Sequence, residues 1–102
     1  AFLGAWNVTE SCNKDSYSVQ ISKDPSNSSQ VLINNFWNTG NCGNVVYGIV
    51  AGSSIYLPEQ SFCDGAFKVD GSGDMLKEKI SWGYSVNDGA DLFNCSATYV
   101  RP

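Results

Sequence analysis

Eight segments of this chain alternate, residue by residue, between aromatic or β-branched side chains and polar side chains. This period-2 alternation is typical of a strand with one buried face, and no segment shows convincing helical spacing. We expect strands at about 4–12, 16–22, 30–37, 44–51, 54–62, 66–73, 78–86 and 92–100. The sequence therefore predicts an all-β protein.

The side chains expected to face inward are large and mostly aromatic or β-branched. They are Trp6, Val8, Tyr17, Val19, Ile21, Val31, Ile33, Phe36, Val45, Tyr47, Ile49, Ile55, Leu57, Phe67, Val69, Ile80, Trp82, Tyr84, Val86, Phe93, Cys95, Ala97 and Tyr99. An eight-stranded barrel has an interior that side chains can fill or that can hold one small ligand. With this many large rings we expect a packed core, and a ligand cavity is the alternative.

Short connectors separate the strands and carry residues that favour turns. Gly and Asn tolerate positive φ, and Asp and Ser close side-chain turns. Such residues fill the segments 24–27, 38–41, 51–53, 70–74 and 87–89. The 102 residues fit a single domain, residues 1–102, and short connectors predict an up-and-down antiparallel meander.

A meander of eight strands exposes two edges unless the first and last strands pair and close the sheet. An antiparallel pairing that sets Cys12 opposite Cys95 also sets Val8 opposite Tyr99 and Trp6 opposite Arg101. Each strand then keeps its inward parity. The sequence predicts a closed barrel in which a Cys12–Cys95 disulfide joins the first and last strands.

Four cysteines in all, with no C-x-x-C pair and no histidine, exclude zinc-finger and zinc-ribbon sites. An even number of cysteines suits disulfides in an oxidising compartment, with four free buried thiols as the alternative. In a meander Cys42 and Cys63 lie on the same rim as Cys12 and Cys95. We expect a second disulfide, Cys42–Cys63, on that rim.

Several motifs in order along the chain resemble one protein family. They are "FLGAWNVTESC", "VLINNF", "IYLPEQ", "VDGSGDM" and "YSVNDGADLFNCSATYV". Together they are similar to small exported lipocalin-like lipoproteins of Bacteroidetes-type bacteria. The resemblance covers nearly the whole chain and implies a lipocalin-like barrel at the cell envelope, tethered by a lipidated cysteine upstream of the domain. The chain departs from the family pattern in its Cys42 and Cys63 pair, and it contains no lipobox cysteine.

The composition argues against several functions. A net charge of −4 and six scattered basic residues do not suit nucleic-acid binding, which needs clustered Lys and Arg. Without histidine the usual general base is missing, and no nucleophile or nucleotide-binding motif stands out. We therefore expect no enzyme, although Asp64 and Asp91 could form a carboxylate pair on the rim. We expect no cofactor or metal, and we interpret 70–74 and 87–91 as turns rather than calcium loops.

The rim that carries the cysteines is the candidate binding site. Trp37 breaks the strand alternation near Cys42, and Phe62 precedes Cys63. With Asn38, Asn41 and Phe93, these side chains could form an aromatic and amide patch. The alternative is that Phe62 is an ordinary inward residue and Trp37 a lid over the end of the barrel.

These observations predict a non-catalytic binding module of the bacterial cell envelope. The expected partner is a small apolar ligand, a glycan or an envelope protein, with no nucleic acid and with membrane contact only through a lipid anchor. We expect a monomer that is exported to the periplasm, the outer membrane surface or the medium. The alternative function is a secreted protease inhibitor on a rigid barrel.

Overall fold

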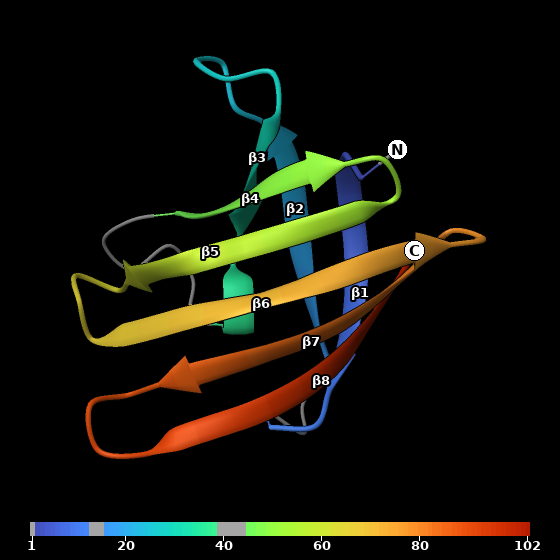
Figure 1. The fold of residues 1–102 in the computed structure, drawn as a ribbon. Coiled ribbons are helices and arrows are strands. Elements are labelled where there is room, and N and C mark those ends of the chain that lie inside the picture. Colours follow the sequence, from blue (N-terminus) through green and yellow to red (C-terminus); the bar gives the residue numbers. More distant parts are fainter. Residues whose placement is uncertain (1, 13–15, 39–44) are drawn as a thin grey trace.

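The protein is an eight-stranded antiparallel barrel (Figure 1). The computed structural model describes residues 2–12, 16–38 and 45–102. The strands are β1 (Gly4–Glu10), β2 (Tyr17–Lys23), β3 (Gln30–Asn34), β4 (Val46–Ala51), β5 (Ser54–Phe62), β6 (Phe67–Leu76), β7 (Lys79–Asn87) and β8 (Leu92–Val100). A 3₁₀ turn, η1 (Phe36–Asn38), follows β3. Within the described residues no helix is long and apolar enough to cross a bilayer.

Each strand pairs with its neighbours in the chain, and β1 pairs with β8 to close the sheet. Val8 lies opposite Tyr99 as expected, and Asn7 lies opposite Val100. The register predicted for closure is therefore confirmed. Trp6 and Arg101 also meet, because the Arg101 guanidinium lies 3.8 Å from the centroid of the Trp6 ring.

The Cys12–Cys95 disulfide is confirmed, with 5.5 Å between the two Cα atoms. No described cysteine is free. Cys42 lies outside the described residues, so the Cys42–Cys63 disulfide remains a prediction. The disulfide that the structure describes joins β8 to the chain two residues beyond the end of β1.

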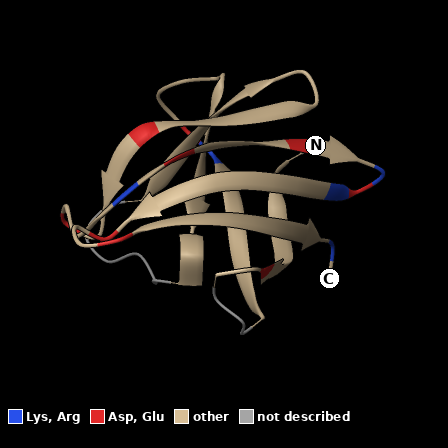
Figure 2. Ribbon diagram, turned by 60° about the horizontal axis from the view of Figure 1, so that its bottom comes forward, with Lys and Arg blue, Asp and Glu red and all other residues tan. Residues whose placement is uncertain are grey.

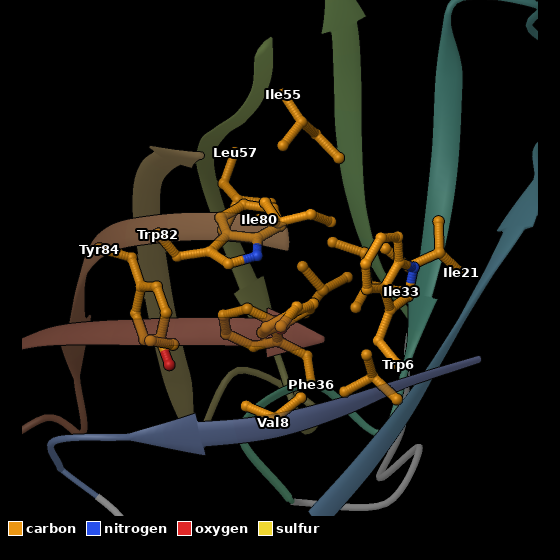
Figure 3. Close-up of a cluster of buried hydrophobic side chains, with 14 of the residues drawn as sticks. Trp6, Val8, Ile21, Ile33, Phe36, Ile55, Leu57, Ile80, Trp82 and Tyr84 are labelled. Atoms are coloured by element: carbon orange, nitrogen blue, oxygen red, sulfur yellow. The ribbon is translucent and has the colours of Figure 1, made fainter. Parts of the chain in front are cut away.

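Side chains fill the barrel. The largest fully buried ones include Trp6, Tyr99, Phe36 and Phe62. Figure 3 shows Trp82, Tyr84, Phe36 and their aliphatic neighbours converging on one cluster. The packed core expected from the sequence is therefore present, since the depressions found on the described residues open to the surface of the barrel.

The predicted parity of β4 was wrong. Val45, Tyr47 and Ile49 were expected inward, but Val46 and Gly48 are the buried residues of this strand. Gly48 pairs with Val31, and Val46 pairs with Ile33. Cross-strand partners share a face of the sheet, and both β3 residues are core residues, so the register of β3 fixes the inward face of β4.

The predicted turn at 70–74 was also wrong. β6 runs through this segment to Leu76, and the turn is made by Lys77 and Glu78, which both have positive φ. Gly71 pairs with Tyr84 and Gly73 pairs with Trp82. A Cβ on Gly71 would lie 2.5 Å from the Tyr84 Cβ, and one on Gly73 would lie 2.8 Å from the Trp82 ring. These glycines make room for aromatic rings on the next strand.

Candidate functional site

One end of the barrel carries the residues that the sequence singled out. We call it the cysteine rim, comprising Cys12 and Cys95, η1 and the turns 63–66 and 88–91. In Figure 1 the β5–β6 and β7–β8 turns lie on the same side of the sheet. The expected gathering of rim residues is thus found for the part of the chain that the structure describes.

The turn after β3 combines a core anchor with a rim aromatic. Strand β3 ends at Asn34 rather than near residue 37, and Phe36 turns back into the core, where it is 2% exposed. Its ring packs 5.7 Å from Phe62 and 5.2 Å from Tyr84, measured between centroids. Phe36 therefore closes this end of the barrel from within. The sequence predicted that Phe36 faces inward, but it placed the residue in the strand rather than in the turn that follows.

Trp37, the next residue after Phe36, is half-buried at the rim. Its ring centroid lies 5.4 Å from that of Phe67 and 6.1 Å from that of Phe93. Its backbone has φ of 58°, a left-handed conformation that a bulky residue rarely adopts. Its Nε1 is buried and has no hydrogen-bond partner among the described residues. The Trp82 Nε1 and the Tyr99 hydroxyl are also buried without a partner among the described residues, so the left-handed backbone is what sets Trp37 apart. Backbone strain of this kind tends to cluster at functional sites.

The other residues predicted for the rim differ in how far they are buried. Phe62 is 1% exposed and belongs to the core, as the alternative interpretation had it. Phe93 is half-buried and packs on Trp37, and Asn38 is exposed, also with positive φ. Asn41 lies outside the described residues. The structure therefore brings together Trp37, Asn38 and Phe93, and it places Phe62 beneath them.

A polar depression of about 230 Å³ lies on the outer side of the same rim. It is lined by Gly65, Ala66, Lys68, Asn87 and Gly89. Ala66 and Lys68 flank Phe67, the residue on which Trp37 packs. Neighbouring residues of a strand face opposite sides of the sheet, so Lys68 points outward while the Phe67 ring points toward Phe62 and Trp37. The depression therefore lies on the opposite face of β6 from Trp37, and its walls offer amide, ammonium and backbone groups.

The acidic residues of the rim lie in turns. Asp64 and Asp91 are both exposed, in the β5–β6 and β7–β8 connections. The Asp88 carboxylate accepts hydrogen bonds from the backbone N–H groups of Ala90 and Asp91, and these bonds lower its pKa. The interpretation of 87–91 as a turn is confirmed. Among the described residues no three His, Cys, Asp or Glu side chains are placed to hold a metal ion.

A carboxylate inside the barrel was missed by sequence reasoning. Glu10 follows the inward parity of Trp6 and Val8 and is half-buried at the end of β1. The Tyr17 hydroxyl donates to Glu10 Oε1, and the Tyr84 hydroxyl donates to Oε2 at 2.7 Å. An acidic residue at an inward position between Val8 and Cys12 was the signal that could have revealed it.

Burial is the main reason that the tyrosines around Glu10 have raised pKa values. It raises the pKa of Tyr17 and Tyr84 well above the usual value of 10.0, and the hydrogen bonds to Glu10 raise both further. Burial, with a smaller contribution from the Glu10 charge, likewise raises the pKa of Tyr99. All three phenols therefore stay protonated in the folded protein, and two of them serve as donors that hold the Glu10 carboxylate.

The comparisons with known proteins give no relative of this chain: no family model, curated protein or solved structure matches it.

Proposed function

We propose that this protein is a non-catalytic, exported binding module of the bacterial cell envelope, and that its cysteine rim binds a glycan. The observation that carries the proposal is Trp37. The indole is fixed at the rim by a left-handed backbone, with Phe36 anchored in the core on one side and exposed Asn38 on the other.

An aromatic ring beside amide groups is a combination that suits a sugar. The ring can stack on the apolar face of a pyranose, and amides can exchange hydrogen bonds with its hydroxyl groups. Asn38 follows Trp37 in the chain and is exposed, so its amide can serve this purpose. A small apolar ligand is less well served here, because Phe36 and Phe62 fill the barrel beneath the rim.

Export and envelope location are supported by the Cys12–Cys95 disulfide, which suits an oxidising compartment. The tether by an upstream lipidated cysteine rests on the resemblance alone. A binding role without catalysis is favoured because the rim carboxylates Asp64 and Asp91 are exposed turn residues and the chain has no histidine.

The test is a glycan array probed with the labelled protein, followed by titration of the best glycan. We expect Trp37→Ala to weaken binding about tenfold, because a central aromatic contact contributes on the order of 1.4 kcal/mol. Tyr56→Ala is the matched control, since Tyr56 is an aromatic residue that is 50% exposed on the outer face of β5. Trp37→Gly is a second variant that removes the indole, and glycine adopts the left-handed backbone of this position without strain.

Equal loss in the Tyr56 and Trp37 variants would contradict the proposal, as would the absence of glycan binding by the wild-type protein. In that case a panel of exported proteases would test the alternative function. Inhibition in the nanomolar range would identify the rim as an inhibitory surface.

A further inference from the structure

Three aspartates of this chain, Asp64, Asp70 and Asp88, are each followed directly by glycine. Such a pair can rearrange without an enzyme, because glycine has no side chain to shield its backbone N–H from the preceding carboxyl group. The structure places the three pairs in different surroundings. Their reactivity in the folded protein should therefore differ, although the dipeptide is the same.

The rearrangement conserves the atoms of the chain. The glycine nitrogen attacks the aspartate Cγ, its proton leaves with the carboxyl hydroxyl as water, and a succinimide ring forms. Water then opens the ring at one of its two carbonyls. Opening at Cγ restores aspartate, whereas opening at the main-chain carbonyl gives isoaspartate, in which the chain continues through Cβ and Cγ. The reaction requires a carboxyl group and an N–H group that are free to meet.

Asp70 is protected by the sheet. It lies within β6, where Gly71 pairs with Tyr84 of β7 on one side and with Leu57 of β5 on the other. The backbone at this pair is extended and held by both neighbouring strands. Reaction at Asp70 therefore requires the strands to separate.

Asp88 is protected by hydrogen bonds within its turn. The Gly89 N–H, which would make the attack, donates to Asn87 Oδ1 at 2.8 Å. The Asp88 Oδ1 accepts from the Ala90 N–H at 2.9 Å and from the Asp91 N–H at 2.7 Å. These two bonds also lower the pKa of Asp88, so they favour the charged carboxylate, which loses water less readily than the neutral carboxyl. Both reacting groups are thus occupied.

Asp64 has neither kind of protection. Asp64 and Gly65 are both exposed in the β5–β6 turn, and Figure 2 shows this turn and the β7–β8 turn, with their acidic residues in red, at the same end of the barrel. The backbone hydrogen bond found in the turn runs from the Ala66 N–H to the Cys63 carbonyl at 3.0 Å. Within the described residues the Asp64 carboxylate and the Gly65 N–H take part in no hydrogen bond.

The backbone of the same turn is strained. Cys63, Asp64 and Gly65 have φ values of 55°, 54° and 84°, and the first two carry a Cβ that disfavours this left-handed conformation. Strain lowers the local stability of an exposed turn, and local opening lets the carboxyl and N–H groups meet.

We propose that Asp64 is a site of spontaneous isoaspartate formation in the folded protein, and that Asp70 and Asp88 resist this modification. The modified turn keeps its negative charge, but its main chain between Phe62 and Phe67 becomes longer by one carbon atom. The proposal does not depend on glycan binding.

The experiment incubates the folded, oxidised protein for several weeks at about pH 5 and about 37 °C, because the neutral carboxyl is the form that loses water. After reduction, trypsin places the three aspartates on separate peptides, residues 24–68, 69–77 and 80–102. Mass spectrometry with electron-transfer fragmentation then identifies isoaspartate, which leaves the peptide mass unchanged, whereas asparagine deamidation raises it. Asp24 does not interfere, because Pro25 has no N–H group.

We expect isoaspartate to form at Asp64 at least about fivefold faster than at Asp70 or Asp88, since one net hydrogen bond protects to about this extent. In the reduced and denatured chain the three sites should react at similar rates. Asn87→Ala should raise the rate at Asp88, because it frees the Gly89 N–H. Asn94→Ala, which removes an exposed amide from the outer face of β8, is the matched control and should leave that rate unchanged.

Any of three results overturns the proposal. They are an absence of isoaspartate at Asp64 in the folded protein, an equal rate at Asp70 or Asp88 in the folded protein, and an equally strong preference for Asp64 in the denatured chain. The last result would assign the selectivity to local sequence rather than to the fold.

Discussion

Two residues at the cysteine rim, Glu10 and Trp37, differ in how their buried polar groups are satisfied. Glu10 is an acidic side chain on the inner face of a strand, and it is accommodated because two buried phenols donate to it. A buried polar group that is fully hydrogen-bonded gives specificity to a core, whereas losing one donor leaves a costly unsatisfied group. Trp37 differs, because its strain and its buried Nε1 find no such compensation in the described residues.

Alkaline pH should destabilise the protein through its buried tyrosines. Because the folded state raises the pKa of Tyr17, Tyr84 and Tyr99, the unfolded chain binds fewer protons than the folded one above about pH 10. The free energy of unfolding is therefore constant with respect to these groups below pH 10 and falls above it. Each tyrosine contributes up to about 1.4 kcal/mol per pH unit.

Urea unfolding between pH 8 and 12 measures this slope, and phenolate absorbance near 295 nm follows ionisation. Tyr84→Phe should reduce the slope, because it removes one of the three phenols whose pKa the folded state raises. Full ionisation of all five tyrosines in the folded protein would contradict the assignment.

In the pair formed by β6 and β7, glycines on one strand lie opposite aromatic residues on the other. Tyr84 and Trp82 lie over Gly71 and Gly73, so the larger side chain of each cross-strand pair fills the space that the smaller one leaves. The pairing explains why a glycine-rich segment continues as strand instead of turning. Composition alone indicated a loop, because glycine in a strand interior weakens the strand unless a neighbour approaches closely.

Gly71→Ala should strongly destabilise the barrel. The new Cβ would lie 2.4 Å from the Gly83 carbonyl oxygen and 2.6 Å from the Tyr84 Cα, so backbone atoms would have to move. Overpacking of this kind costs about 1–3 kcal/mol or more. Gly83→Ala is the matched control on the facing strand, where a Cβ meets no atom within 4 Å.

The measurement is the urea midpoint of the two variants at equal slope. A Gly71→Ala protein as stable as Gly83→Ala would show that β6 and β7 can separate at little cost, which the observed pairing argues against.

At the scale of the whole molecule, closure depends on few contacts. The pairing of β1 with β8 spans residues 7–10 and 97–100, whereas β7 and β8 pair along the whole length of both strands. The Cys12–Cys95 disulfide reinforces the shorter seam. Because it joins residues 83 apart in sequence, it removes much of the entropy of the unfolded chain.

Replacing Cys12 and Cys95 together by Ser should lower the free energy of unfolding by at most about 4.5 kcal/mol, the value that loop-closure entropy gives for this separation. Chemical unfolding of the oxidised wild type against the double variant measures the loss. Non-reducing peptide mapping checks the pairing itself. A Cys12 peptide linked to any cysteine other than Cys95 would contradict the closed barrel.

The sequence by itself determined the number of strands, their approximate positions, the order of the meander and the register that closes it, but it misplaced the end of β3 and the turn after β6. Period-2 alternation reports one buried face, and the matched positions of Cys12, Val8 and Tyr99 allow one closing register. The strand positions are local features that follow from the spacing of side chains within each segment. The closing register depends on one pairing, that of the first strand with the last.

Tertiary structure alone decided the inner face of β4 and the roles of the rim residues. β4 is apolar on both faces, so its own alternation is ambiguous, and the register against Val31 and Ile33 chooses the face. Phe36 and Trp37 are adjacent aromatics, yet one is buried and the other lies at the rim because the chain enters a left-handed turn between them. Packing against distant strands sets these choices, and that information is not present in any single segment.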